Sequence, residues 1–110
     1  YTGGVFAAGS YDKVEGATTF KDGYQVVRMD VLSHGYEPNT FTIQQGAPVK
    51  WIVNGINVLG CQGFLNVPRL GIAQALEEGD NIFEFTPTAD MDLIGFSCST
   101  NAMQGSFRVM

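Results

Sequence analysis

Three sulfur-bearing residues are the side chains of this sequence best suited to chemistry. The chain has two cysteines, Cys61 and Cys98, and Met103 follows the second within the short polar stretch Ser99–Gln104. Thiolate and thioether sulfurs are soft ligands, and they select a soft ion, above all Cu(I). The residue types and their spacing therefore predict a metal centre, and we interpret Cys61, Cys98 and Met103 as its ligands.

Each of these residues has a second interpretation. Two cysteines and no others permit a structural or redox disulfide, or two inert thiols, in place of a metal pair. Met103 is either a ligand or core filler, because methionine packs irregular gaps readily. The one histidine, His34, is either an additional ligand or a solvated loop residue. We interpret the remaining methionines, Met29, Met91 and Met110, as structural.

The segments that must position these residues look like short β-strands. Val27, Met29 and Val31 alternate with polar residues, which is the two-residue period of a half-buried strand. Comparable short segments follow, separated by turns rich in Gly, Pro, Asn and Asp. About eight such strands predict an all-β fold, a two-sheet Greek-key β-sandwich. They are residues 25–32, 40–44, 49–54, 64–67, 72–76, 81–85, 93–98 and 105–109.

The ends of the chain and two of its connections have their own signals. Residues 1–24 lack a sustained period and predict a flexible N-terminal arm or linker, which leaves residues 25–110 as one domain. Residues 33–39 predict a loop. Glu77-Glu78-Gly79-Asp80 predicts a hairpin turn that joins the strands on either side of it.

Strand direction indicates where the sulfur-bearing loops lie. The strand 40–44 leads away from the loop 33–39, and the strand 49–54 returns, so Cys61 is expected at the end of the sandwich where that loop lies. Ile94, Phe96 and Cys98 share one face of their strand, which aims Cys98 inward at the edge of the core. We expect this strand to end at the same place and to bring Cys98 and Met103 close to Cys61.

Composition excludes several other functions. The net charge is −5, and the six basic residues are spread out, so the chain lacks the basic stripe of a nucleic-acid-binding protein. It has no apolar run of about 18 residues that would span a bilayer. The histidine has no Ser or Cys partner in a catalytic motif, and the glycines form no phosphate-binding loop. We therefore predict no enzymatic activity, no small-molecule substrate and no nucleic-acid partner.

Several sequence blocks carry a resemblance to a known family. These are Gly35-Tyr36-Glu37-Pro38-Asn39, Val49-Lys50-Trp51, Gly60-Cys61, Phe83-Glu84-Phe85-Thr86-Pro87, Phe96-Ser97-Cys98 and Met103-Gln104-Gly105. In this order they resemble the cupredoxin-like domain, over roughly residues 25–110. The resemblance is strongest to its Cu(I)-binding branch, found in membrane-tethered copper chaperones and in domains appended to sulfite-exporter-like membrane proteins.

The resemblance has definite implications for the metal. A blue copper protein would carry a histidine where this chain has Cys61, and a second histidine between Cys98 and Met103. A chain with one histidine cannot build a centre of two His and one Cys. The resemblance instead implies a sulfur-rich copper site that holds Cu(I) for sequestration or for transfer to a partner, such as a membrane copper transporter. It also implies a membrane-associated soluble domain on the extracytoplasmic side.

Two other functions fit the same residues. An electron-transfer cupredoxin with an atypical cysteine-rich copper centre would use the Cu(II)/Cu(I) couple of the same site. A thiol/disulfide redox protein would need an exposed cysteine of low pKa, and neither cysteine lies in a Cys-X-X-Cys motif.

Overall fold

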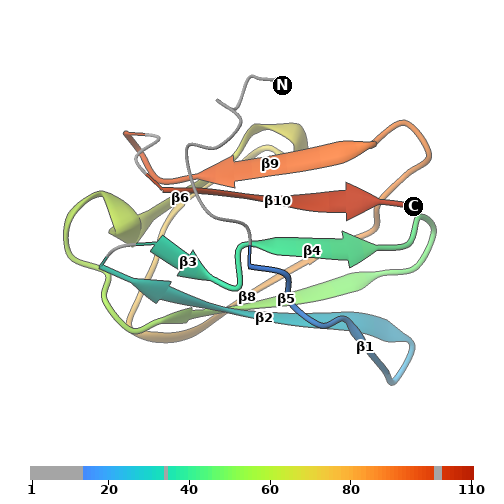
Figure 1. Ribbon diagram of the computed structural model, residues 1–110, viewed down its shortest axis with the longest axis horizontal. Helices are drawn as coiled ribbons and strands as arrows, with labels where there is room; N and C mark the ends of the chain where they lie inside the picture. The colour runs from blue at the N-terminus through green and yellow to red at the C-terminus, as the bar shows by residue number, and fades with distance from the viewer. Residues whose placement is uncertain (1–13, 34, 101–102) are drawn as a thin grey trace.

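In the part of the chain that the computed structural model describes, ten strands and two single-turn 3₁₀ helices are present (Figure 1). The structure describes residues 14–33, 35–100 and 103–110, with side chains for all of these except residues 61 and 62. Within this part of the chain, no helix is long and apolar enough to cross a membrane. The elements in chain order are β1 (Thr19–Lys21), β2 (Tyr24–Leu32), β3 (Gly35–Glu37), β4 (Thr40–Ile43), β5 (Val49–Gly55), η1 (Gly60–Gly63), β6 (Phe64–Val67), η2 (Pro68–Leu70), β7 (Ile72–Ala75), β8 (Gly79–Phe85), β9 (Leu93–Ser97) and β10 (Gln104–Val109).

The strands form two sheets that pack face to face. One sheet has the order β1-β2-β5-β8, with β3 added to β2, and the other has the order β4-β10-β9-β6-β7. Each sheet contains a parallel pair, β2 with β5 and β4 with β10, among otherwise antiparallel strands. The predicted all-β, two-sheet sandwich is therefore confirmed.

Alternation along the strands builds the core between the sheets. In β5 every second residue from Val49 to Gly55 is buried, and β2 follows the same two-residue pattern. Trp51 lies among three phenylalanines from both sheets, with ring centroids 5.8 Å from Phe83, 4.9 Å from Phe96 and 4.8 Å from Phe107. This aromatic cluster holds the two layers together.

Two predicted connections were wrong. Residues 77–80 do not form a hairpin turn, because β7 pairs with β6 in one sheet whereas β8 pairs with β5 in the other. The Asn81 side chain holds this crossing segment, donating to the carbonyls of Glu77 and Gly79 and accepting from the Glu77 N–H. Residues 33–39 are not all loop, because β3 lies there and buries Tyr36 opposite Val31 of β2.

Part of the predicted N-terminal arm belongs to the sheets. Of residues 1–24, those up to 13 lie outside the described residues. Beyond them the Val14 N–H donates to the Asn39 side chain at 2.9 Å, Glu15 forms a bridge with Thr40, and β1 pairs with β2. The sandwich therefore includes the chain from residue 14 onward.

Candidate functional site

Cys98 and Met103 lie together where β9 leads into β10. The Cys98 N–H donates to the Met103 carbonyl at 3.1 Å, which continues the β9–β10 ladder into the connection. Both side chains are part of the hydrophobic core, with 0% of Cys98 and 6% of Met103 exposed. A cysteine and a methionine are thus held side by side at one end of the sandwich, which we call the sulfur end.

The backbone of Cys61 reaches the same end from the other side. Cys61 lies in η1, which directly precedes β6, and β6 runs antiparallel to β9 with Asn66 opposite Ser97. In this register, η1 and the first residues of β6 lie toward the end of β9 from which the chain continues to Cys98. Gly63 is fixed there, because its carbonyl accepts from the Leu76 N–H at 2.8 Å. The side chain of Cys61 lies outside the described residues.

Cys98 is in the oxidised state. Its sulfur is part of a disulfide. The Thr100 hydroxyl oxygen lies 3.5 Å from the Cys98 sulfur. Because the thiolate is the form of cysteine that binds a metal, this sulfur becomes a ligand only after reduction.

Tyr36, at the sulfur end, has a buried hydroxyl group without a hydrogen-bond partner. It is 2% exposed, and its hydroxyl has no hydrogen-bond partner. Burial raises the pKa of Tyr36 above its usual value, so the phenol stays protonated. Its ring packs against Phe96, with centroids 5.4 Å apart. A missing hydrogen-bond partner leaves no mark in the sequence, so only the structure reveals this feature.

The surface around the sulfur end is acidic with an apolar tip. Five of the eleven carboxylates lie on the strand ends and turns there. Ile56 and Leu59, in the loop between β5 and η1, are 55% and 79% exposed. One carboxylate at this end has a basic partner, because a guanidinium nitrogen of Arg28 lies 3.4 Å from a carboxylate oxygen of Asp80. The five carboxylates belong to Asp30, Glu37, Glu77, Glu78 and Asp80.

The other predicted site residues are placed as follows. His34 lies outside the described residues, so the structure does not test whether it is an additional ligand. Met29 is buried in β2, while Met91 and Met110 lie toward the opposite end of the sandwich. Among the described side chains, no group of three or more His, Cys, Asp or Glu could hold a metal ion.

A pocket lies on the sheet that carries Cys98, where β9 and β6 diverge. Its lining includes Asn66, Arg69, Leu93 and Gly95. The Arg69 guanidinium donates to the Asp90 carbonyl there. None of these residues supplies sulfur, so we assign the pocket no part in metal binding.

Comparison with solved structures identifies the fold. The metal binding domain of the Cu(I)-exporting P-type ATPase CopA from Streptococcus pneumoniae, solved with Cu(I), aligns with a TM-score of 0.77 and 22% identity, over 90% of this chain and 96% of that one. A copper binding protein solved by NMR in its apo form gives 0.76 and 24%, over 93% and 100%. A rusticyanin gives 0.61 and 16%, over 90% and 82%.

These structures show that the chain has the cupredoxin-like β-sandwich fold. No protein-family model and no curated protein matches the sequence.

Proposed function

We propose that this domain binds copper as Cu(I), through Cys61 and Cys98 in their reduced form together with Met103, and holds it for sequestration or transfer. The observation that carries this proposal is the sulfur end itself. Cys98 and Met103 are buried side by side there, and the backbone of η1 brings Cys61 to the same place. Two of the similar structures are described as copper-binding, one of them with Cu(I).

The donor set fits a soft monovalent ion. Two thiolates and one thioether give Cu(I) a three-sulfur environment with a net charge of −1, and this softness disfavours hard cations. Loading first requires that the disulfide accept two electrons and two protons from a thiol reductant, giving two cysteine thiols and the oxidised reductant. Each thiol then loses its proton as the ion binds.

The surface at the sulfur end supports transfer to another protein. Five carboxylates and the exposed side chains of Ile56 and Leu59 lie at the sulfur end, whereas Lys21, Lys50 and Arg108 lie toward the opposite end. This arrangement orients the sulfur end toward a partner with a basic docking face, because complementary charges accelerate and orient encounter. A membrane copper transporter with such a face is the partner that we propose, which would place this domain beside a membrane.

The proposal is tested by titrating Cu(I) under anaerobic, reducing conditions against a chromogenic Cu(I) chelator. The wild-type protein is expected to withdraw copper from the chelator, and a Cys61→Ser, Cys98→Ser double variant is expected to lose that competition. Met91→Leu, at the opposite end, is the matched control and should bind as the wild type does. Tight binding that survives in the double variant would refute the proposal.

The disulfide at Cys98 favours a second candidate, a thiol/disulfide redox function without metal. Native mass spectrometry of protein purified without added copper separates the two functions. A mass deficit of two hydrogens, reversible by thiols and unaffected by Cu(I), indicates the redox function. An added mass of copper on the reduced protein indicates the metal centre.

The electron-transfer alternative requires a stable Cu(II) form. A Cu(II)–thiolate centre absorbs intensely in the visible range, so a coloured complex after addition of Cu(II) supports this alternative. A colourless complex, formed as the added Cu(II) is reduced, supports Cu(I) holding and transfer.

A further inference from the structure

The Tyr36 hydroxyl is buried at the sulfur end without a hydrogen-bond partner. Tyr36 is 2% exposed, and its Oη makes no hydrogen bond. Buried polar atoms in folded proteins are almost always paired, and an unpaired one destabilises the fold and needs an explanation. A phenylalanine would fill the same space without this penalty, so packing alone does not account for the hydroxyl.

The position of Tyr36 in the sheet places it close to the candidate ligands. It lies opposite Val31, which lies opposite Gly55, so the three residues form one row across β3, β2 and β5. Gly55 is the last residue of β5, from which the chain continues to η1 and Cys61. Tyr36 therefore occupies the last inward-facing row before the sulfur end.

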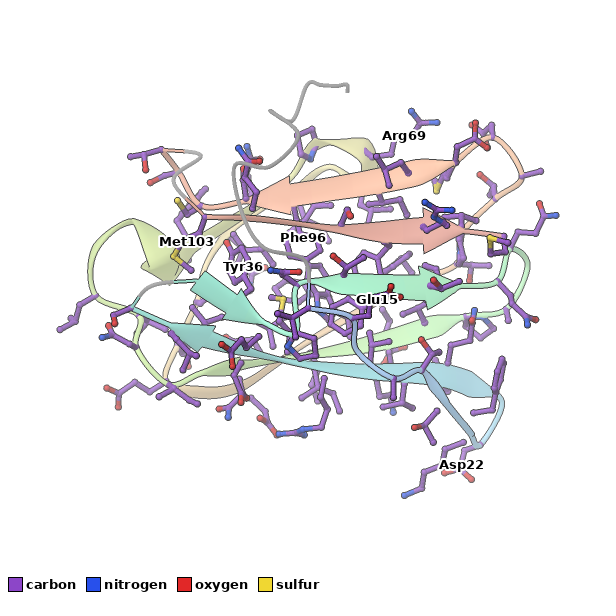
Figure 2. All side chains as sticks on the ribbon, viewed as in Figure 1. Glu15, Asp22, Tyr36, Arg69, Phe96 and Met103 are labelled. Atoms are coloured by element: carbon purple, nitrogen blue, oxygen red, sulfur yellow. The ribbon has the colours of Figure 1, made fainter. Side chains whose placement is uncertain are left out.

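The facing sheet brings Cys98 to the same region. Phe96 packs on the Tyr36 ring, and Cys98, which lies two residues later and directly follows the end of β9, is also buried. In Figure 2, Tyr36 is drawn between Met103 and Phe96. β3 also contacts β10, whose first residue follows Met103 directly. Tyr36 thus lies on the core side of the segments that lead to Cys98 and Met103, away from water.

We infer that Tyr36 is a positioning residue of the metal centre, whose hydroxyl donates a hydrogen bond to the Cys98 thiolate once the centre is reduced and loaded. This inference rests on the proposed function. A disulfide sulfur is a weak acceptor, whereas a metal-bound thiolate carries negative charge and accepts a charge-assisted hydrogen bond. The Tyr36 hydroxyl, which has no partner in the oxidised form, would supply this hydrogen bond in the loaded form. In many metal sites the ligands are oriented by hydrogen bonds from neighbouring residues that do not touch the metal.

The test compares Tyr36→Phe with the matched control Tyr24→Phe, which removes a hydroxyl from the exposed face of the other end of β2. The affinity for Cu(I), and for Ag(I) as a second soft ion, is measured by chelator competition. The affinity of Tyr36→Phe is expected to fall about tenfold, equivalent to about 1.4 kcal/mol. Tyr24→Phe is expected to match the wild type.

The melting temperatures of the oxidised and the Cu(I)-loaded protein distinguish a positioning role of Tyr36 from a purely structural one. Tyr36→Phe should raise the melting temperature of the oxidised, metal-free protein, because an unpaired buried hydroxyl is gone. It should lower the melting temperature of the Cu(I)-loaded protein relative to wild type, because a hydrogen bond is lost. Shifts of the same sign and size in both forms overturn the inference.

The outcomes also separate this inference from the proposed function. If the wild type binds Cu(I) and Tyr36→Phe binds it equally well, the inference fails and the proposed function stands. If the wild type itself does not bind Cu(I), both fail. The phenylalanine ring keeps the contact with Phe96, so a folded variant is expected for every measurement.

Discussion

Gly105 lies in β10 directly opposite Phe96 of β9, behind the candidate site, and replacing it with alanine should destabilise the protein strongly. An added Cβ would lie 2.4 Å from two ring atoms of Phe96 and 2.6 Å from the Asn39 carbonyl oxygen. Real Cβ contacts do not occur at such distances. The Phe96 ring has little freedom to move, because it also packs against Tyr36, Trp51 and Phe107.

The size of the effect follows from two contributions. Overpacking of a close-packed core typically costs about 1–3 kcal/mol. The Asn39 carbonyl must also move, and it accepts a hydrogen bond from the Ser106 N–H at 2.9 Å, worth about 1 kcal/mol. Together these give a loss of about 2–4 kcal/mol, a large share of the roughly 5–15 kcal/mol that stabilises a domain of this size.

Urea unfolding followed by the fluorescence of Trp51 measures this loss. With a slope of about 1–3 kcal/mol per molar urea, the midpoint of Gly105→Ala should fall by roughly 1–3 M. Thr42→Ala, on the exposed face of neighbouring β4, is the matched control and should change the midpoint little. The prediction is wrong if the midpoint of Gly105→Ala equals that of the control.

A second substitution checks the cause. Phe96→Leu removes the ring atoms that crowd position 105, so Gly105→Ala should be less damaging in that background. The difference, measured as a double-mutant cycle, should be about 0.5–3 kcal/mol and favourable. The contact with Asn39 remains in both backgrounds, so rescue should be partial. Full additivity of the two changes would refute the steric argument.

Three further predictions concern other parts of the structure. The Tyr24 hydroxyl donates to Glu84 at 3.2 Å, and this hydrogen bond, with the carboxylate charge, raises the pKa of Tyr24. The stability from this contact is present below the usual tyrosine pKa of about 10 and is lost as the pH rises through the raised value. Glu84→Gln should therefore lower the titration midpoint of Tyr24, followed by ultraviolet absorbance. Asn39→Ala removes the acceptor of the Val14 N–H, so it should lower the free energy of unfolding by about 1–3 kcal/mol and speed proteolytic cleavage near residue 14. Added salt should slow copper transfer to a partner with a basic face, whereas transfer to an uncharged chelator should keep its rate.

The strands with clear alternation were predictable because their pattern reflects burial directly. In β5 the sequence alone places Val49, Trp51 and Val53 on one face, and the structure buries all three. β3 escaped prediction because three residues are too few to show a period. The false hairpin at residues 77–80 has a different cause. Local turn composition does not reveal whether the next strand joins the same sheet or crosses to the other one.

The candidate site shows a similar division. Strand parity predicts that Cys98 points into the core beside Phe96, and both are buried in the structure. The role inferred for Tyr36 depends on what surrounds its hydroxyl, and this is a property of tertiary packing that one sequence does not express. Metal binding by Cys61, Cys98 and Met103 stays a prediction for the titration to test.

The unequal attachment of β9 to its two neighbours has a mechanical consequence. Five residue pairs join β9 to β10, whereas the single pair Asn66–Ser97 joins it to β6. Moving Cys98 would therefore break a continuous ladder, while tilting the β6–β7 hairpin and η1 as a unit would break one bridge in the sheet. We expect the two cysteine-bearing segments to differ in stiffness, with Cys98 held in place by the β9–β10 ladder and η1 free to move together with the β6–β7 hairpin.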